Sequence, residues 1–157
     1  MGSVVIQALQ GDVMFRKTNR AFTLVEILIV VVILGILAAI VVPSFIGAVE
    51  EASVGTTQSE LDKLRRAVDV FQVRNGNALP AVAAGDGTWG DLIAGDGAYL
   101  KEAPVNPYVG GTNQQVIVLS NAPDAAFQTV HAWIYNTTTG EVWAGGFDAN
   151  DEPLPRP

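Results

Sequence analysis

The chain of 157 residues contains no cysteine and only one histidine. Without cysteine there is no disulfide, no zinc–thiolate site and no cysteine nucleophile, so an exported domain must hold together by packing alone. The sequence also lacks a phosphate-binding loop, a dinucleotide-binding glycine motif, a metalloprotease helix and a Gly-x-Ser-x-Gly elbow. The single histidine, His131, is expected on the solvent face of a strand. These absences predict a protein that is not an enzyme.

Positive charge is scarce and unevenly distributed. Nine Lys and Arg stand against sixteen Asp and Glu, which gives a net charge of −7. The first twenty-one residues have a net charge of +2, so the remaining residues have a net charge of −9. An acidic surface of this kind argues against binding nucleic acid through a general positive field.

The chain has only one long hydrophobic run. Sixteen apolar or glycine residues extend from Ile27 to Val42, and the uncharged stretch continues to Val49, which is long enough for one membrane-spanning helix. Cations precede the run and Glu50 follows it, which places the N-terminus in the cytoplasm. A secretory signal would be shorter and would end in a small-residue cleavage site. A plain single-pass anchor fits better, but neither alternative explains Glu26 near the start of the run.

The segment RKTNRAFTLVEILIVVVILGILAAIVVPSF, which begins at Arg16, resembles the N-terminal signature of type IV pilins and of the pseudopilins of type II secretion. The resemblance implies that a prepilin peptidase cuts between Ala21 and Phe22 and methylates the new N-terminus. Phe22 would be the first mature residue, Glu26 the fifth, and Pro43 the helix-bending proline of the family. The family usually has Gly before the cut, where this chain has Ala21.

The same resemblance gives Glu26 a role in assembly. A lone carboxylate buried among neighbouring helices of a filament is untenable. The family provides the amine of Phe22 on an adjacent subunit as its partner, which would set the axial register of each added subunit. The alternative is a glutamate at the membrane edge whose side chain reaches water.

The helical pattern continues beyond the apolar run. Leu61, Leu64, Val68 and Phe71 recur at spacings of three and four, which predicts one apolar face. We therefore expect a helix from residue 22 to residue 75, ended by Asn-Gly-Asn at 75–77. Pro43 lacks a backbone N–H and should bend or locally melt this helix.

The rest of the chain predicts loops and then strands. Ala-Gly-Asp-Gly occurs at 84–87 and at 94–97 and indicates turns, with a short helical turn between them and a rigid Pro-x-x-Pro connector at 104–107. Segments 114–120, 129–136 and 141–146 are rich in β-branched and aromatic residues, and a hairpin is expected at 137–140. Trp133 and Tyr135 should share the face that covers the helix. The expected fold class is α+β: a long N-terminal helix packed on a small antiparallel sheet of three strands.

These segments give a predicted domain organisation. Residues 1–21 form a cytoplasmic leader that is removed, residues 22–49 the transmembrane and polymerisation half of the helix, and residues 50–157 a periplasmic domain. Within that domain we expect the amphipathic half of the helix at 50–75, a loop region at 76–113, the sheet at 114–147 and an acidic tail at 148–157.

The acidic tail is the one candidate metal site. Its four oxygen ligands of the type that calcium uses are Asp148, Asn150, Asp151 and Glu152. The tail loosely resembles the C-terminal loop of major pseudopilins, which holds calcium in that family. A plain solvated acidic tail explains the residues equally well.

Taken together, the resemblance predicts a structural subunit, most of all the major pseudopilin of a type II secretion system. It would form a homopolymer through the N-terminal helices and meet a prepilin peptidase, an inner-membrane assembly platform and minor pilins or pseudopilins. It would first lie in the bacterial inner membrane and then in a periplasmic or surface filament. The alternatives are a type IV pilus subunit, for adhesion, motility or DNA uptake, and an anchored periplasmic binding module that never polymerises.

Overall fold

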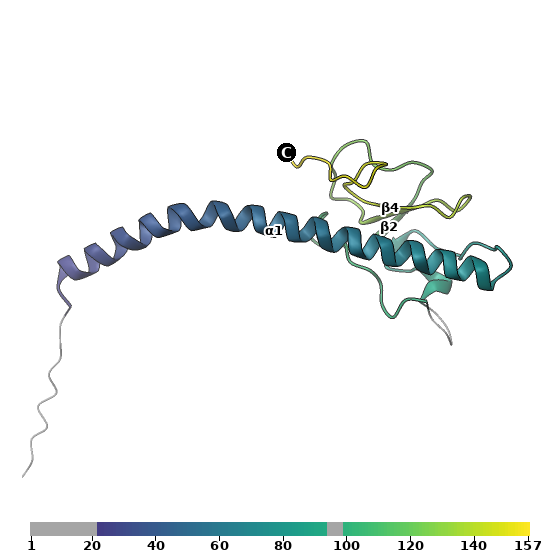
Figure 1. Ribbon diagram of the computed structural model, residues 1–157, viewed down its shortest axis with the longest axis horizontal. Coiled ribbons are helices and arrows are strands. Elements are labelled where there is room, and N and C mark those ends of the chain that lie inside the picture. The colour runs from purple at the N-terminus through teal and green to yellow at the C-terminus, as the bar shows by residue number, and fades with distance from the viewer. Residues whose placement is uncertain (1–21, 94–98) are drawn as a thin grey trace, which may run out of the picture. The chain divides into compact units, whose positions relative to one another are not determined.

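The computed structural model describes residues 22–93 and 99–157, without the side chains of Pro43, Ser44 and Asp86. The described chain divides into two compact units whose boundary falls between Val41 and Val42. Helix α1, Leu24–Arg74, contributes to both units, and all described strands belong to the second unit (Figure 1). Among the described residues, α1 is the one helix long and apolar enough to cross a membrane.

Helix α1 has clear start and stop signals. It begins after Thr23 and ends before Asn75, within two residues of the predicted limits. The chain then turns through Gly76 and Asn77, both with positive φ angles of 64° and 69°. The backbone N–H of Asn77 donates to the carbonyl of Gln72 at 2.8 Å, which satisfies one of the last helical acceptors. The helical assignment continues through position 43, and the side chain of Pro43 lies outside the described residues.

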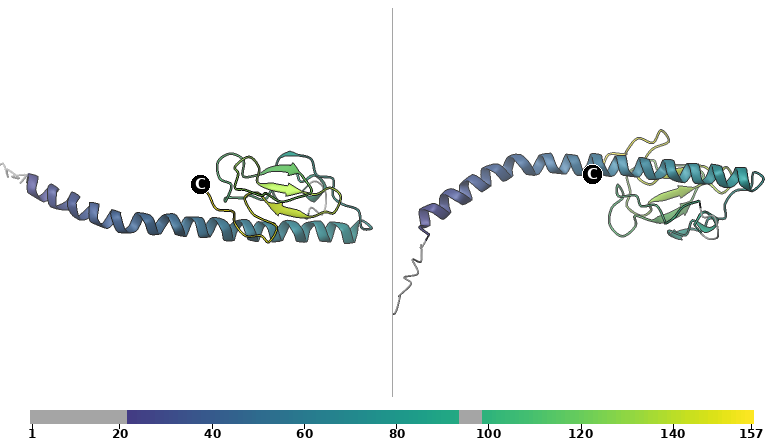
Figure 2. Two further views of the ribbon diagram at one scale, coloured as in Figure 1. Left: turned by 90° about the horizontal axis from the view of Figure 1, so that it is seen from above. Right: turned by 60° about the horizontal axis from the view of Figure 1, so that its bottom comes forward.

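The core of the second unit lies between α1 and the sheet. The predicted apolar face is confirmed, because Leu61, Leu64, Val68 and Phe71 are all buried there. Figure 2 shows the strands lying along this part of α1. The residues that meet the helix include Trp133 and Tyr135, as predicted from their alternation, together with Ile117, Val142 and Ala144.

The sheet has four strands in the order β1-β2-β3-β4: β1 Gly85–Asp86, β2 Val116–Leu119, β3 Trp133–Tyr135 and β4 Val142–Ala144. The α+β class and the β3–β4 hairpin are confirmed. The prediction of a wholly antiparallel, three-stranded sheet is wrong, because β2 pairs with β3 in parallel and β1 adds an edge strand. The connection from residue 120 to residue 132 is long enough to bring the chain back to the end of the sheet at which β2 begins, as a parallel pair requires.

Two shorter features complete the unit. The 3₁₀ helix η1, Gly90–Leu92, confirms the expected helical turn, and Leu92 and the neighbouring Trp89 are fully buried. The second Ala-Gly-Asp-Gly segment, 94–97, lies outside the described residues, whereas Gly85 and Asp86 of the first belong to β1 rather than to a plain turn. Residues 104–107 form an irregular connector, as predicted.

Candidate assembly site

The start of α1 holds the candidate assembly residues. The Glu26 carboxylate folds back over the first turn, where its Oε2 accepts from the Thr23 backbone N–H at 2.8 Å and from the Thr23 hydroxyl at 2.9 Å. In return the Glu26 N–H donates to the Thr23 hydroxyl at 3.2 Å. This reciprocal arrangement is a capping box, which satisfies N–H groups that the first helical turn leaves unpaired. Ala21 lies outside the described residues, and the predicted cleavage and methylation at Phe22 stay predictions.

Sequence reasoning about Glu26 missed Thr23. The signal was present, because Thr-Leu-Val-Glu has the S/T-x-x-E spacing of a capping box directly before an apolar run. The structure therefore gives Glu26 a partner within its own chain, in addition to the partner that the family resemblance implies.

The apolar residues that follow Glu26 are uncovered in a single chain. From Ile27 to Val42 every large hydrophobic side chain is about half exposed or more, and Phe22 is 78% exposed. Soluble monomers rarely expose contiguous apolar surface on this scale. The described residues of one copy leave this surface uncovered, which is the character of a surface that meets lipid or other chains.

The C-terminal turn is held against α1 by an ion pair. The guanidinium of Arg65 donates from Nη1 to Asp151 Oδ2 at 2.6 Å and from Nη2 to Asp151 Oδ1 at 2.9 Å, a bidentate geometry. The same guanidinium donates to the carbonyl of Val142 at the start of β4. Gln58 on α1 also donates to the Asp151 carbonyl at 3.1 Å. We call this set, Arg65 with Asp151, Val142 and Gln58, the C-terminal clasp.

The same turn contains the predicted calcium ligands. Asp148 Oδ1 accepts from the backbone N–H groups of Glu152 at 3.0 Å and of Asn150 at 2.8 Å, and these bonds lower the pKa of Asp148. Asp151 faces Arg65, so its charge is already paired. Within the described residues no three Asp, Glu, His or Cys side chains gather in a way that suits a metal ion. The four residues share one turn in which Asp151 is engaged by Arg65, and calcium binding stays a prediction from the sequence.

Two buried polar networks were not predicted. Asn106, in the Pro-x-x-Pro connector, is fully buried and accepts from the Thr57 hydroxyl of α1 at 3.0 Å and from the N–H of Tyr108 at 3.0 Å. Its side-chain amide donates to the carbonyls of Ala132 and Gly145, each at 2.9 Å. Asn106 therefore ties the helix, the connector and the sheet together.

The second network corrects the prediction for His131. This residue precedes β3 rather than lying within a strand, and its side chain is only 17% exposed. Its Nε2 lies 3.1 Å from Asp124 Oδ1, while Asp124 Oδ2 accepts from Gly146 N–H and Gln128 Nε2. Burial by itself would raise the pKa of Asp124, but hydrogen bonds from His131, Gly146 and Gln128 together lower it. The pair braces the 120–132 connection against the loop after β4.

Helix α1 is apolar all round at its capped start and amphipathic where it packs on a small sheet. This combination defines the pilin-like class of subunit. Residues 16–42 match the family described as the prokaryotic N-terminal methylation motif. The type II secretion system core protein G of Aeromonas hydrophila is 34% identical over 103 residues, which cover 60% of this chain and 71% of that protein.

Further relatives carry the same name. The Klebsiella pneumoniae protein is 33% identical over 122 residues, covering 69% of this chain and 87% of the relative, and the Pseudomonas aeruginosa protein is 34% identical over 72% of its length. This chain therefore belongs to the type II secretion system core protein G family and is a pilin-like pseudopilin subunit. These relatives are named as secretion-system components rather than as enzymes. No solved structure matches the chain significantly.

Proposed function

We propose that this pseudopilin is the major subunit of its pseudopilus and that it polymerises through the first part of α1. The observation that carries the proposal is the apolar surface from Ile27 to Val42, which the described chain leaves uncovered and which begins directly after the carboxylate residue Glu26. Lipid covers such a surface before assembly, and the same segments of neighbouring copies cover it in a filament. One surface thus serves two successive environments.

The proposed location follows from the charges that flank the span. Before assembly, the cationic N-terminal side faces the cytoplasm and the second unit lies in the periplasm, with α1 anchored in the inner membrane. A prepilin peptidase then removes residues 1–21 and methylates Phe22. The mature subunit joins the filament with an inner-membrane assembly platform and minor pseudopilins as further partners.

The proposed role of Glu26 in the filament is to pair with the Phe22 amine of an adjacent copy. The capping box supports this role, because it uses only Oε2 and places the carboxylate beside the mature N-terminus. The other carboxylate oxygen remains available for an incoming cationic group. A subunit added in the wrong axial register would bury both charges apart from each other, which is strongly unfavourable.

Mass spectrometry and electron microscopy together test the proposal. The native protein should yield an N-terminal peptide that begins with methylated Phe22, and overproduction should give filaments that an antibody to the second unit labels. Recovery of mature protein that still carries Met1 would contradict the processing. Absence of filaments, with a correctly processed monomer, would instead favour an anchored binding module. Labelled fibres produced without a secretion system would favour a type IV pilus.

A further inference from the structure

The second unit carries a groove in which most of its positive charge is concentrated. The groove runs between α1 and the segment that follows residue 98, with a cavity volume of about 720 Å³. From Phe22 onward the chain has fifteen acidic and six basic residues, and four of the six basic residues line this groove. The four cations are Lys63, Arg66, Arg74 and Lys101. We call this surface the basic groove.

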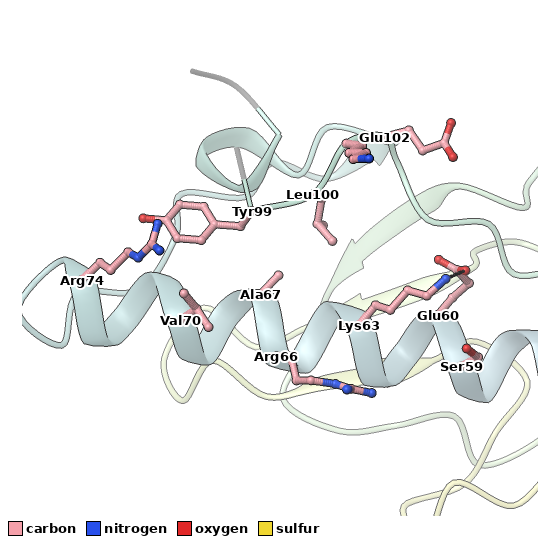
Figure 3. Close-up of a pocket in the computed structure, with 11 residues that line it drawn as sticks. Ser59, Glu60, Lys63, Arg66, Ala67, Val70, Arg74, Tyr99, Leu100 and Glu102 are labelled. Carbon is pink, nitrogen blue, oxygen red and sulfur yellow. Dashed lines mark hydrogen bonds and ion pairs between the residues drawn. The ribbon is translucent and has the colours of Figure 1, made fainter. Parts of the chain in front are cut away.

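The cations of the basic groove are only weakly satisfied within the chain. Lys63 pairs with Glu60, and Arg66 lies 4.0 Å from Asp62, but their side chains are 55% and 75% exposed. Arg74 stacks over the ring of Tyr99 at 5.5 Å and has no described ion pair (Figure 3). Surface pairs of this kind contribute little to the stability of the fold. The positive charge is therefore available to an external anionic group.

An acidic pair on the same helix carries the charge opposite to that of the basic groove. Glu50 and Glu51 follow the apolar run, Glu51 is exposed, and neither residue has an ion pair among the described residues. With about 3.6 residues per turn and 1.5 Å per residue, Glu51 lies roughly a sixth of a turn round the helix and about 22 Å along it from Arg66. The acidic pair and the basic groove are thus separate surfaces that one copy cannot bring together.

We propose that the basic groove of one copy receives Glu50 and Glu51 of a second copy in the filament. Two different patches, offset along the axis and round it, make a head-to-tail contact that repeats without closing, which is the requirement for an open polymer. Opposite charges at such a contact also suppress wrong registers. The inference rests on the proposed function, since it requires parallel copies shifted along a common axis.

Crosslinking between two variants tests this contact directly, because the chain has no native cysteine. Cells that produce Glu51→Cys and Arg66→Cys chains together, each in the full-length protein, are treated with a short bismaleimide. We expect dimers in the filament fraction and none from either variant alone. Thr138→Cys, at the exposed tip of the β3–β4 hairpin, replaces Arg66→Cys as the matched control and should give no dimer.

Charge reversal provides a second test of the contact. Arg66→Glu should lower the filament yield about tenfold because it places like charges opposite each other. The combination of Arg66→Glu with Glu51→Lys should restore the yield, whereas Arg66→Glu with Glu152→Lys should not. If the wild type and the Arg66→Glu variant give equal filament yields, the groove contact alone is overturned. Dimers that form equally with Thr138→Cys would overturn it as well. A wild-type chain that never forms filaments would instead overturn the proposed function.

Discussion

The two parts of helix α1 differ in what surrounds them. Before Val42 every large apolar side chain is exposed, whereas after Ser53 most apolar residues, among them Leu61, Leu64 and Val68, form one stripe that is buried. A helix that is apolar all round requires an apolar environment, and an amphipathic helix requires only one apolar neighbour. The second part finds that neighbour in its own sheet. The first part has no such neighbour among the described residues, so its surroundings must be apolar, as lipid or the same segment of other copies would be.

The largest expected effect is on solubility, and it tests the comparison itself. A fragment that begins at Glu50 keeps the buried stripe with the whole sheet and loses the exposed run. We expect it to be soluble and monomeric, with a cooperative thermal transition, whereas the full chain should need detergent. Sedimentation with and without detergent measures the difference. Aggregation of the fragment, together with a full chain that stays dispersed in buffer alone, would show that the helix is divided elsewhere.

The next effect concerns Glu26, the only charge in the uncovered part. Glu26→Ala should still insert into the membrane and be cut, but filament assembly should fail, because the Phe22 amine of the neighbour would be buried without a partner. Glu26→Gln should fail similarly, although glutamine can still complete the capping box. Imaging of sheared fibres and crosslinking between subunits measure assembly.

Thr23→Ala is the matched control for the Glu26 variants. It removes both side-chain contributions of Thr23 to the capping box but leaves the carboxylate in place. Assembly should therefore survive, with some fraying of the first helical turn. Normal fibres from Glu26→Ala would show that the carboxylate does not direct assembly.

In the covered part the largest effect should come from Asn106. Asn106→Ala leaves buried N–H and carbonyl groups without partners and should lower the free energy of unfolding of the Glu50 fragment by about 3 kcal/mol. Asn113→Ala removes a single exposed hydrogen bond to Thr129 and should change little. Urea denaturation followed by tryptophan fluorescence gives both values. Equal effects of the two substitutions would mean that Asn106 is not the link between helix and sheet.

A smaller effect is expected at the C-terminal clasp. Asp151→Asn keeps a residue type that tolerates the positive φ of 61° but removes the charge that Arg65 binds, so we expect a loss of about 1 kcal/mol from a partly exposed pair. Arg65→Gln should cost a similar amount, and the double variant should cost less than the sum.

The effect of calcium on the melting temperature distinguishes two states of the C-terminal turn: the clasp and the metal site that the sequence predicts. If the turn keeps Asp151 paired with Arg65, millimolar calcium should leave the melting temperature of the Glu50 fragment unchanged. A rise of several degrees that chelator reverses would show that the turn rearranges round an ion, since binding to the folded state alone raises stability. Asp148→Ala would then abolish the rise.

The smallest expected effect is the pH dependence from Asp124. Its folded-state pKa is lowered, so its contribution to stability is present above the unfolded value of 3.8 and is lost as pH falls through the folded value. As pH falls below about 4, the wild-type melting temperature should therefore fall more steeply than that of Asp124→Asn. Asp69→Asn, on the exposed side of α1, should follow the wild-type curve. Parallel curves for all three proteins would contradict the role of this carboxylate.

Local patterns predicted much of this molecule. The limits of α1, its buried stripe and the alternation of Trp133 and Tyr135 follow from periodicity and from an Asn-Gly-Asn stop. The N-terminal motif predicted the family because its charges, carboxylate and proline occur at fixed spacing. Such features depend on residues that are near one another in the sequence.

The features that escaped prediction depend on distant residues. The parallel pairing of β2 with β3 is decided by where the 120–132 connection ends, and no local propensity records that position. The partners of Asn106 likewise come from segments far away along the chain, and the His131–Asp124 pair is held by Gly146 from the loop after β4. Thr23 is different, since its capping signal was local and was overlooked beside the stronger family motif.

The capping box affects the state of a subunit in the membrane before assembly. With its carboxylate held by two donors on Thr23, an unassembled chain presents no bare anion at the membrane edge and so has little tendency to associate wrongly there. A cationic partner can then meet the other carboxylate oxygen while Oε2 keeps its two Thr23 donors. In the proposed filament, a subunit would therefore need no rearrangement of its first helical turn before it is added.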